Sequence, residues 1–240
     1  MQKIIISDLH LDETRPYITD LFINFINNLP VGTEALYILG DFFEAWIGDD
    51  DTNEHNSKII NHLKKLNDKG LPVYFMHGNR DFLIGKSFLK STGCTLLADE
   101  HCETIYGNKI LLMHGDTLCT KDIKYLKFRK KSRKWWAQKL FLLKSLEKRR
   151  NLVKEYRKAS KAHMSTLPDH IMDVTPEEVI RVMEKHGVNT LIHGHTHREA
   201  IHEIEVNNSP AKRYVLGAWH ERGSALICSD DGKIEPISID

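Results

Sequence analysis

The sequence has no apolar run that approaches the roughly 20 residues needed to cross a bilayer. Its N-terminal apolar stretch, residues 4–6, is too short for a signal peptide and leads directly into Asp8. The four cysteines show no CxxC pairing, so reduced, structural thiols are expected. Internal repeats and low-complexity tracts are also missing. We therefore expect a cytoplasmic protein with an ordinary globular core.

A formal net charge of +1 hides an uneven distribution of charge. Residues 121–161 hold 17 of the 34 Lys and Arg residues but only three acids, which gives this stretch a net charge of +14. The rest of the chain carries −13. The sequence thus combines a cationic module with an acidic body.

The first part of the chain alternates predicted strands and helices. Short apolar runs at residues 3–7, 35–39 and 73–76 are typical of buried strands. Apolar side chains recur at helical spacing over residues 17–28 and 54–69. This alternation predicts parallel strands joined by helical crossovers.

The pattern changes after residue 100. Residues 101–106 and 109–113 flank a Gly107-Asn108 turn signal and predict a hairpin. A helix is expected over residues 176–186, followed by a strand over 188–192. The C-terminal strands, expected to be antiparallel, are residues 199–207, 212–216, 225–229 and 234–239. Two sheets packed face to face with helices outside fit this order, which is an α/β (α+β) class.

Residues 121–168 interrupt this plan. The segment has no glycine, is rich in helix-forming residues and surrounds an apolar run with cations. We predict a helical lid inserted into a core made of residues 1–120 and 169–240. The sequence leaves open whether Trp135 and Trp136 form the lid's own core or contact lipid.

Seven side chains able to bind a metal ion occur in five short blocks. They are Asp8, His10, Asp41, Asn79, His114, His195 and His197. Mixed carboxylate, imidazole and amide donors suit two divalent cations about 3.5–4 Å apart, which bind a phosphate and activate water at neutral pH. Asp41 follows Gly40, which allows close backbone approach, and is the candidate bridge. Oxygen and imidazole donors favour Mn²⁺, with iron and zinc as alternatives.

The blocks resemble those of the calcineurin-like metallophosphoesterase superfamily, which read D-x-H, G-D, G-N-H-D, H and G-H-x-H. One position departs, because Arg80 stands where most of that superfamily has a histidine. With this arginine, the segments YILGDFFEAWIGDD, HGNRDFLIGKSF, LLMHGDTLCTKD and LIHGHTHREAIH are similar to the UDP-2,3-diacylglucosamine diphosphatases of lipid A biosynthesis. The resemblance implies a four-layer αββα sandwich with a helical cap.

The resemblance also implies a role for each block residue. Asp8, His10, Asp41 and His197 would surround one Mn²⁺, and Asp41, Asn79, His114 and His195 the other. Substrate contacts would come from Asn79, Arg80, Asp122, Ser160 and His195. Met164 and Leu167 depart from the polar or lysine residues that are usual at these lid positions. This leaves the lid's hold on the substrate open, with Lys158 or Lys161 as candidate substitutes.

The implied reaction is hydrolysis of the diphosphate bond of UDP-2,3-diacylglucosamine. Hydroxide held by the two ions would attack the α-phosphorus and give UMP and 2,3-diacylglucosamine 1-phosphate (lipid X). The cationic and apolar lid predicts contact with an anionic membrane surface. We expect a monomer, peripheral on the cytoplasmic face of the inner membrane, with no nucleic-acid partner. A metallophosphodiesterase acting on a soluble nucleotide or nucleoside diphosphate derivative is the alternative.

Arg80 gives a physical reason to favour a diphosphate. Cleavage of a diphosphate expels a phosphate monoester whose second pKa is about 6, so it leaves without a proton at neutral pH. An acid at this position is then unnecessary. A permanent, planar cation instead stabilises the negative charge of the transition state.

The neighbouring acids and histidines are expected to have structural roles. The three aspartates at residues 49–51 lack the spaced oxygen ligands of a calcium loop and predict a solvated acidic loop. His77 and His193 adjoin predicted ligands and are expected to pack inside strand ends. Asp81 is expected to orient a neighbouring group, with a ligand histidine as the candidate.

Overall fold

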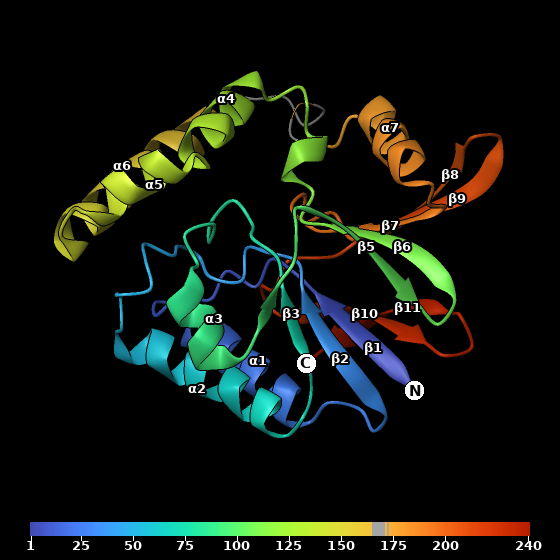
Figure 1. The fold of residues 1–240 in the computed structure, drawn as a ribbon, viewed down its shortest axis with the longest axis horizontal. Helices are drawn as coiled ribbons and strands as arrows, with labels where there is room; N and C mark the ends of the chain where they lie inside the picture. Colours follow the sequence, from blue (N-terminus) through green and yellow to red (C-terminus); the bar gives the residue numbers. More distant parts are fainter. Residues whose placement is uncertain (165–170, 172) are drawn as a thin grey trace.

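Two sheets packed face to face form the centre of the molecule (Figure 1). In this computed structural model, which describes residues 1–164, 171 and 173–240, the first sheet has the order β11-β10-β1-β2-β3-β4. Its strands are β1 (Gln2–Ile6), β2 (Thr33–Ile38), β3 (Val73–Phe75), β4 (Thr95–Leu96), β10 (Gly223–Ser229) and β11 (Ile234–Ile239). Strands β1 to β4 are parallel, and β10 pairs antiparallel with β1 and β11. The predicted parallel pairing with helical crossovers is confirmed.

The second sheet has the order β5-β6-β7-β9-β8. Its strands are β5 (Glu100–Ile105), β6 (Asn108–Met113), β7 (Thr190–His193), β8 (Ala200–Val206) and β9 (Ser209–Val215). The predicted hairpin joins β5 and β6, and its turn residues Tyr106 and Gly107 both have positive φ, as a two-residue hairpin of this hand requires. The same turn, made by Asn207 and Asn208, joins β8 and β9.

The expectation of purely antiparallel C-terminal strands is wrong in one respect. Strand β9 pairs antiparallel with β8 but parallel with β7, and the two C-terminal hairpins belong to different sheets. Alternation of apolar and polar residues reports which face of a strand is buried, not which strand lies beside it. The sequence pattern therefore could not separate the two hairpins.

Helices cover the outer face of each sheet (Figure 1). Helices α1 (Pro16–Asn27), α2 (Glu54–Asp68) and α3 (Lys86–Thr92) cover the first sheet, and α7 (Pro176–His186) covers the second. Pro16 occupies the first turn of α1, and the Asn53 side chain accepts a hydrogen bond from the backbone N–H of Asn56 at the start of α2. Helix α7 ends at Gly187, whose φ of 59° is left-handed.

Three apolar layers hold these four layers of structure together. The layer under α1, α2 and α3 includes Phe22, Phe42 and Trp219, all buried. The layer between the sheets joins Ile5 to Ile192, and the layer under α7 includes Met183. This arrangement is the predicted αββα sandwich, and the predicted fold class is confirmed.

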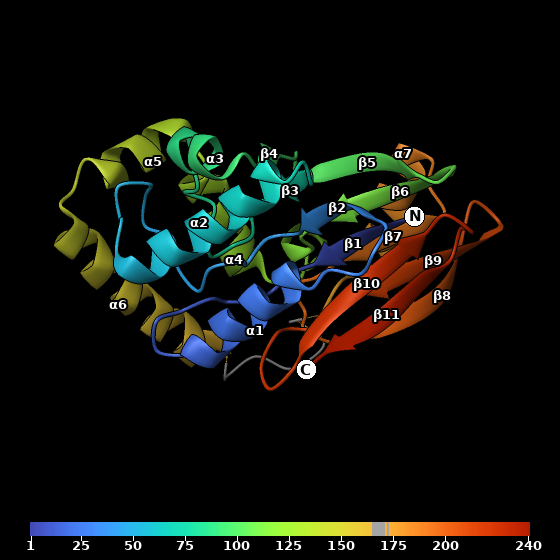
Figure 2. The ribbon, with the colours of Figure 1, turned by 90° about the horizontal axis from the view of Figure 1, so that it is seen from below.

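Three helices continue the chain beyond a short 3-10 turn (Asp116–Leu118). They are α4 (Ile123–Ser132), α5 (Trp135–Leu142) and α6 (Leu146–Met164), and they fall within the predicted insertion. Figures 1 and 2 place them together at the end of the sheets opposite the N-terminus. Leu167 lies outside the described residues, as does the side chain of Met164. No helix in the described part of the chain is long and apolar enough to cross a membrane.

The expected solvated loop at residues 49–51 is wrong. Asp49 accepts hydrogen bonds from the backbone N–H groups of Gly85, Ser87 and Phe88, at 2.9–3.0 Å, and so caps helix α3. The other two aspartates pair with Arg149 and Arg150 of α6. The acidic run therefore caps α3 and contacts the insertion, because helix ends and the buried Arg149 need carboxylate partners.

Candidate metal centre

The seven predicted ligand residues follow the carboxyl ends of five strands in two sheets. Asp8 and His10 follow β1, Asp41 follows β2 and Asn79 follows β3. His114 follows β6, whereas His195 and His197 follow β7. Loops at the carboxyl ends of neighbouring parallel strands share one edge of a sheet, which is where α/β folds place ligands. The structure brings all seven side chains into two adjacent clusters.

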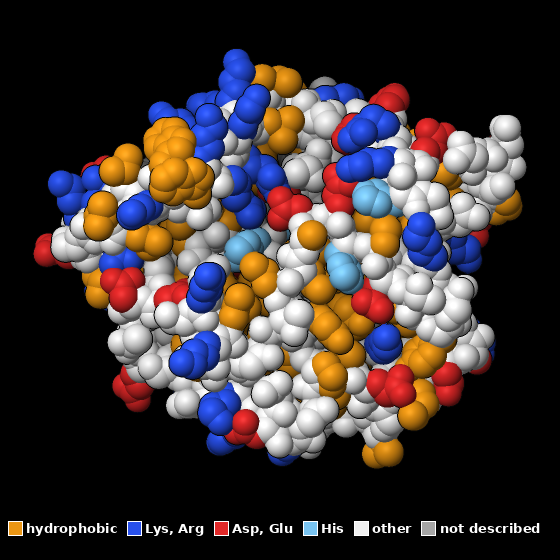
Figure 3. Space-filling model, viewed as in Figure 1, with side chains coloured by type: hydrophobic (Ala, Val, Ile, Leu, Met, Phe, Trp, Pro, Cys, Tyr) orange, Lys and Arg blue, Asp and Glu red, His pale blue; other side chains and the backbone are white. Residues whose placement is uncertain are grey.

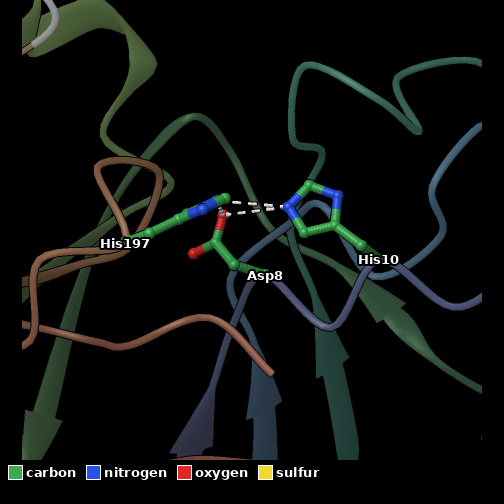
Figure 4. A group of neighbouring side chains, drawn as sticks. All are labelled: Asp8, His10 and His197. Atoms are coloured by element: carbon green, nitrogen blue, oxygen red, sulfur yellow. Dashed lines mark hydrogen bonds and ion pairs between the residues drawn. The ribbon is translucent and has the colours of Figure 1, made fainter. Parts of the chain in front are cut away.

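The first cluster contains Asp8, His10 and His197 (Figure 4). Asp8 Oδ1 lies 3.4 Å from His197 Nε2 and 4.0 Å from His10 Nε2. The two Nε2 atoms are 3.2 Å apart. Asp8 Oδ1 is fully buried and has no hydrogen-bond partner among the described residues. Three electron-pair donors that converge around a buried, unsatisfied oxygen fit a cation.

The second cluster contains Asp41, His114 and His195, with Asn79 between the two rings. Asn79 Oδ1 lies 2.9 Å from both His114 Nε2 and His195 Nδ1. His114 Nδ1 is held by the carbonyl oxygen of Leu39 at 2.9 Å, which fixes the ring and turns Nε2 toward the cluster.

Asp41 faces both clusters. Its Oδ1 lies 3.6 Å from His114 Nε2, and its Oδ2 lies 3.8 Å from His10 Nε2. A carboxylate with one oxygen on each side is the arrangement that a bridging ligand requires. The candidate bridge is thus placed between the two groups.

Close backbone approach makes this arrangement feasible. A Cβ atom on Gly78 would lie 2.1 Å from Asp41 N, and one on Gly194 would lie 2.0 Å from Asp8 Oδ2. Asp8 Oδ2 accepts hydrogen bonds from Ser7 Oγ and from the backbone N–H of His195. Gly78 and Gly194 are therefore required for space.

Burial keeps two of the histidines, His10 and His195, able to donate electron pairs, whereas His114 is buried next to Asp41 and Asp8, which raise its pKa. Burial, reinforced by the nearby His114, lowers the pKa of His195 to about 4. Burial also lowers the pKa of His10. A neutral imidazole keeps a lone pair free for a metal, so the donor set fits two divalent cations.

The predicted substrate residues lie at different distances from the clusters. Arg80 is partly exposed, with Nε 4.0 Å from Asp41 Oδ2, so its guanidinium borders the shared Asp41 on the side that faces His10. Asp122 accepts a hydrogen bond from the backbone N–H of Tyr125 and caps α4. Ser160 lies half-buried on α6. The structure thus places Arg80 at the clusters, and Asp122 and Ser160 on the helices of the insertion.

A family model for calcineurin-like phosphoesterases matches residues 1–199 of the chain. The chain belongs to the calcineurin-like phosphoesterase family. The resemblance of its motifs to that family is therefore confirmed, and the two clusters occupy the matched residues.

Within this phosphoesterase family, the chain is similar to curated proteins named UDP-2,3-diacylglucosamine hydrolase. It is 52% identical to the one from Coxiella burnetii (strain RSA 331 / Henzerling II), over 97% of this chain and 95% of the relative. It is 50% identical to that of Enterobacter sp. (strain 638), over 97% of both chains. It is 48% identical to that of Azotobacter vinelandii, over the full length of both chains.

A solved structure supports the fold. The structure of an archaeal phosphodiesterase covers 99% of both chains with a TM-score of 0.50, at 15% sequence identity. At that identity the likeness concerns the phosphoesterase fold alone.

The structure corrects the role expected for Asp81 and adds one residue, Glu44, that the sequence did not indicate. Asp81 accepts hydrogen bonds from the backbone N–H groups of Phe42 and Gly78, at 2.8 and 2.7 Å, so it joins two ligand loops and does not orient a histidine. Burial and the nearby Asp41 raise its pKa to about 6. Glu44, which no motif indicated, lies 2.8 Å from His10 Nδ1. Only the three-dimensional structure reveals this contact.

Proposed function

We propose that this chain hydrolyses the diphosphate bond of UDP-2,3-diacylglucosamine and yields UMP and 2,3-diacylglucosamine 1-phosphate, a step of lipid A biosynthesis. The observation that carries the proposal is a guanidinium, Arg80, beside two clusters of metal-binding side chains that share Asp41. The names of the full-length relatives supply the substrate.

The cofactor in this proposal is a pair of Mn²⁺ ions. Asp8, His10 and His197 would hold one, Asn79, His114 and His195 would hold the other, and Asp41 would contact both. Hard oxygen donors combined with imidazoles suit Mn²⁺. When bound, two such ions polarise the phosphate and supply a nucleophilic water at neutral pH.

The chain's own groups orient the substrate and stabilise charge. Arg80 donates to the oxygens of the diphosphate, and Asn79 and His195 contact the same group. Water adds to the α-phosphorus, and the bond from that phosphorus to the bridging oxygen breaks. The bond pair leaves with the sugar 1-phosphate, which is already a stable anion at neutral pH and needs no proton. Arg80 therefore acts as a charge-stabilising residue and not as an acid.

The insertion would act as a lid that presents the lipid to this site. Its five arginines all contact the core. From α4 and the residue after it, Arg129 bonds to Asp116 and Asp99, and Arg133 donates to the Gly78 carbonyl oxygen. From α6, the ion pairs are Arg149–Asp50, Arg150–Asp51 and Arg157–Glu44. None of its twelve lysines forms an ion pair with a described residue. The docked cations are thus arginines, and the lysines remain available to anions.

Exposed apolar side chains lie among these lysines (Figure 3). Trp135 is 74% exposed, and Leu140 and Leu143 are 59% and 75% exposed. Trp135 and Trp136 are therefore not the lid's own core. A cationic surface with protruding tryptophan and leucine side chains favours an anionic bilayer. We place the protein, as a monomer, on the cytoplasmic face of the inner membrane, with no nucleic-acid partner.

Hydrolysis in ¹⁸O water tests the proposed reaction. Mass spectrometry should find the label in UMP, because water adds to the uridine-side phosphorus. Label in the lipid product would place the attack on the other phosphorus. Turnover of lipid-free UDP-glucosamine at the same rate would favour the soluble-nucleotide alternative.

Metal removal tests the cofactor. EDTA should abolish the reaction, and Mn²⁺ added in excess should restore it, because the donors of both clusters would otherwise lack a cation. Full activity in protein shown by elemental analysis to be metal-free would contradict the proposal.

A further inference from the structure

Glu44 lies between a predicted metal ligand and the insertion. Its Oε2 is 2.8 Å from His10 Nδ1, the ring nitrogen opposite the Nε2 that faces Asp8 and Asp41. On its other side, Arg157 of α6 forms an ion pair with Glu44 Oε1 and donates to its backbone oxygen at 2.9 Å. The Glu44 carboxylate thus contacts both a predicted metal ligand, His10, and the insertion helix α6.

The backbone around Glu44 is fixed next to His10. Glu44 N donates to the Leu11 carbonyl at 3.0 Å, and Leu11 N donates to the Phe42 carbonyl at 2.8 Å. The Glu44 side chain is 21% exposed and that of His10 is 7% exposed. Their contact is therefore held by local structure and shielded from water, although at 2.8 Å it is a close approach and not yet a formed hydrogen bond.

We propose that Glu44 is a positioning residue that couples metal binding at His10 to the docking of α6 through Arg157. The assignment rests on the function proposed above. A carboxylate on Nδ1 keeps the proton there, leaves the Nε2 lone pair toward the cluster and increases its basicity. The same carboxylate holds Arg157, so the lid helix and the metal ligand depend on one group.

This coupling is reciprocal. A cation on Nε2 makes Nδ1–H a stronger donor and so favours a hydrogen bond to Glu44 Oε2, which lies 2.8 Å away. That bond orders the carboxylate that receives Arg157. Docking of Arg157 likewise orders Glu44 for His10. By linkage, a metal that tightens α6 is itself bound more tightly when α6 is docked. The Arg150–Asp51 pair also joins α6 to the core, but neither residue has a contact with a predicted metal ligand among the described residues, which makes Arg150 a matched control.

Calorimetric titration of the metal-free protein with Mn²⁺ gives the first measurement. Glu44→Gln should weaken Mn²⁺ binding by roughly 10- to 100-fold, the usual effect of removing a carboxylate behind a ligand histidine. Glu44→Asp, which keeps the charge but shortens the side chain, should recover part of the affinity. Arg150→Ala should bind Mn²⁺ as the wild type does. Unchanged affinity in both Glu44 variants would overturn the assignment.

Hydrogen exchange of α6 gives the second measurement, and it is independent of activity. Mn²⁺ should slow amide exchange around Arg157 in the wild type and in Arg150→Ala. It should not do so in Glu44→Gln or Arg157→Ala. Equal protection by Mn²⁺ in all four proteins would show that the metal and the helix are not coupled.

The two proposals fail in different ways. A wild type that binds Mn²⁺ and protects α6 but leaves the lipid intact would refute the proposed function and uphold the coupling. A wild type that hydrolyses the lipid, with Glu44→Gln binding Mn²⁺ normally, would refute the coupling alone.

Discussion

Single residues in the candidate metal centre adopt backbone conformations that L-amino acids rarely adopt. Asp8, His10, Asp41, His195 and His197 have φ values between 48° and 69°. Aspartate and histidine tolerate this region better than most residues, but it still costs about 1–3 kcal/mol at each position. Five such residues at one site indicate that the surrounding structure holds the donors in place at the expense of stability.

His197 offers a direct test of this strain. Its φ is 58° and its side chain is 36% exposed, so its removal disturbs little packing. In metal-free protein, His197→Gly should be more stable than His197→Ala by about 1 kcal/mol, measured by urea unfolding, because only glycine accepts positive φ without a penalty. Asn61, exposed in helix α2, is the control, and there the alanine variant should be the more stable by about 1 kcal/mol. If the alanine variant is the more stable at His197 as well as at Asn61, backbone strain at His197 is ruled out.

Arg80 should affect the rate of hydrolysis much more than the affinity for metal. Arg80→Ala should lower kcat/KM for UDP-2,3-diacylglucosamine by about 10²- to 10³-fold, because a fixed donor to the developing charge is lost. Arg80→Lys keeps the positive charge but loses the planar guanidinium, so its kcat/KM should lie between those of the wild type and Arg80→Ala. Mn²⁺ titration of each variant separates the effects. An Arg80→His protein more active than the wild type would contradict the role given to the guanidinium.

At the scale of elements, Asp49 stabilises the start of helix α3. Its two oxygens accept three backbone N–H groups at the start of α3 and the indole N–H of Trp46. Asp49→Ala should lower the free energy of unfolding by about 1–2 kcal/mol, as for other helix caps. Asp20→Ala, which breaks an exposed pair with Lys58, should change it by less than about 1 kcal/mol. Equal effects in urea unfolding would mean that Asp49 is merely solvated.

The sequence predicts elements with a strong period and misses those that depend on contacts from afar. The apolar repeat of α7 and the runs of β1 and β2 identify these elements to within about two residues. Helix α3 has only seven residues, and its cap comes from Asp49, far away in the chain. Short elements stabilised by distant side chains carry no local signal. The placement of β9 beside β7 also has no local signal, because the alternation of apolar and polar residues does not indicate which strand is the neighbour.

The candidate site divides in a similar way. The seven predicted ligands share short blocks at strand ends, so their convergence follows from parallel strands in two sheets that pack face to face. Glu44 and Asp81 belong to no such pattern, because their partners are a histidine ring and backbone N–H groups on other loops. A role of that kind depends on how the loops fold against one another.

At the scale of the whole molecule, the arginines and the lysines of the insertion face different surroundings. The arginines of residues 121–161 contact acids and carbonyl groups of the core, whereas the lysines extend outward. A planar guanidinium suits buried and bidentate contacts, and a hydrated ammonium suits an anionic surface. The excess charge in the sequence is thus divided between arginines that dock the insertion and lysines on a surface that we propose contacts lipid.

Reversing charge on the exposed lysines should therefore weaken membrane binding without loosening the insertion. Lys131 and Lys139 are exposed and unpaired among the described residues. Each lysine near an anionic bilayer contributes about 1 kcal/mol, so Lys131→Glu with Lys139→Glu should weaken binding to phosphatidylglycerol vesicles by more than about tenfold. Lys65→Glu with Lys69→Glu changes the net charge equally but lies at the end of α2, and it should bind nearly as the wild type does. Cosedimentation at low and high salt measures both. If the two double variants bind the vesicles equally, net charge alone determines the attraction and the surface of the insertion has no special role. Salt should weaken the binding of both double variants to the same extent in that case.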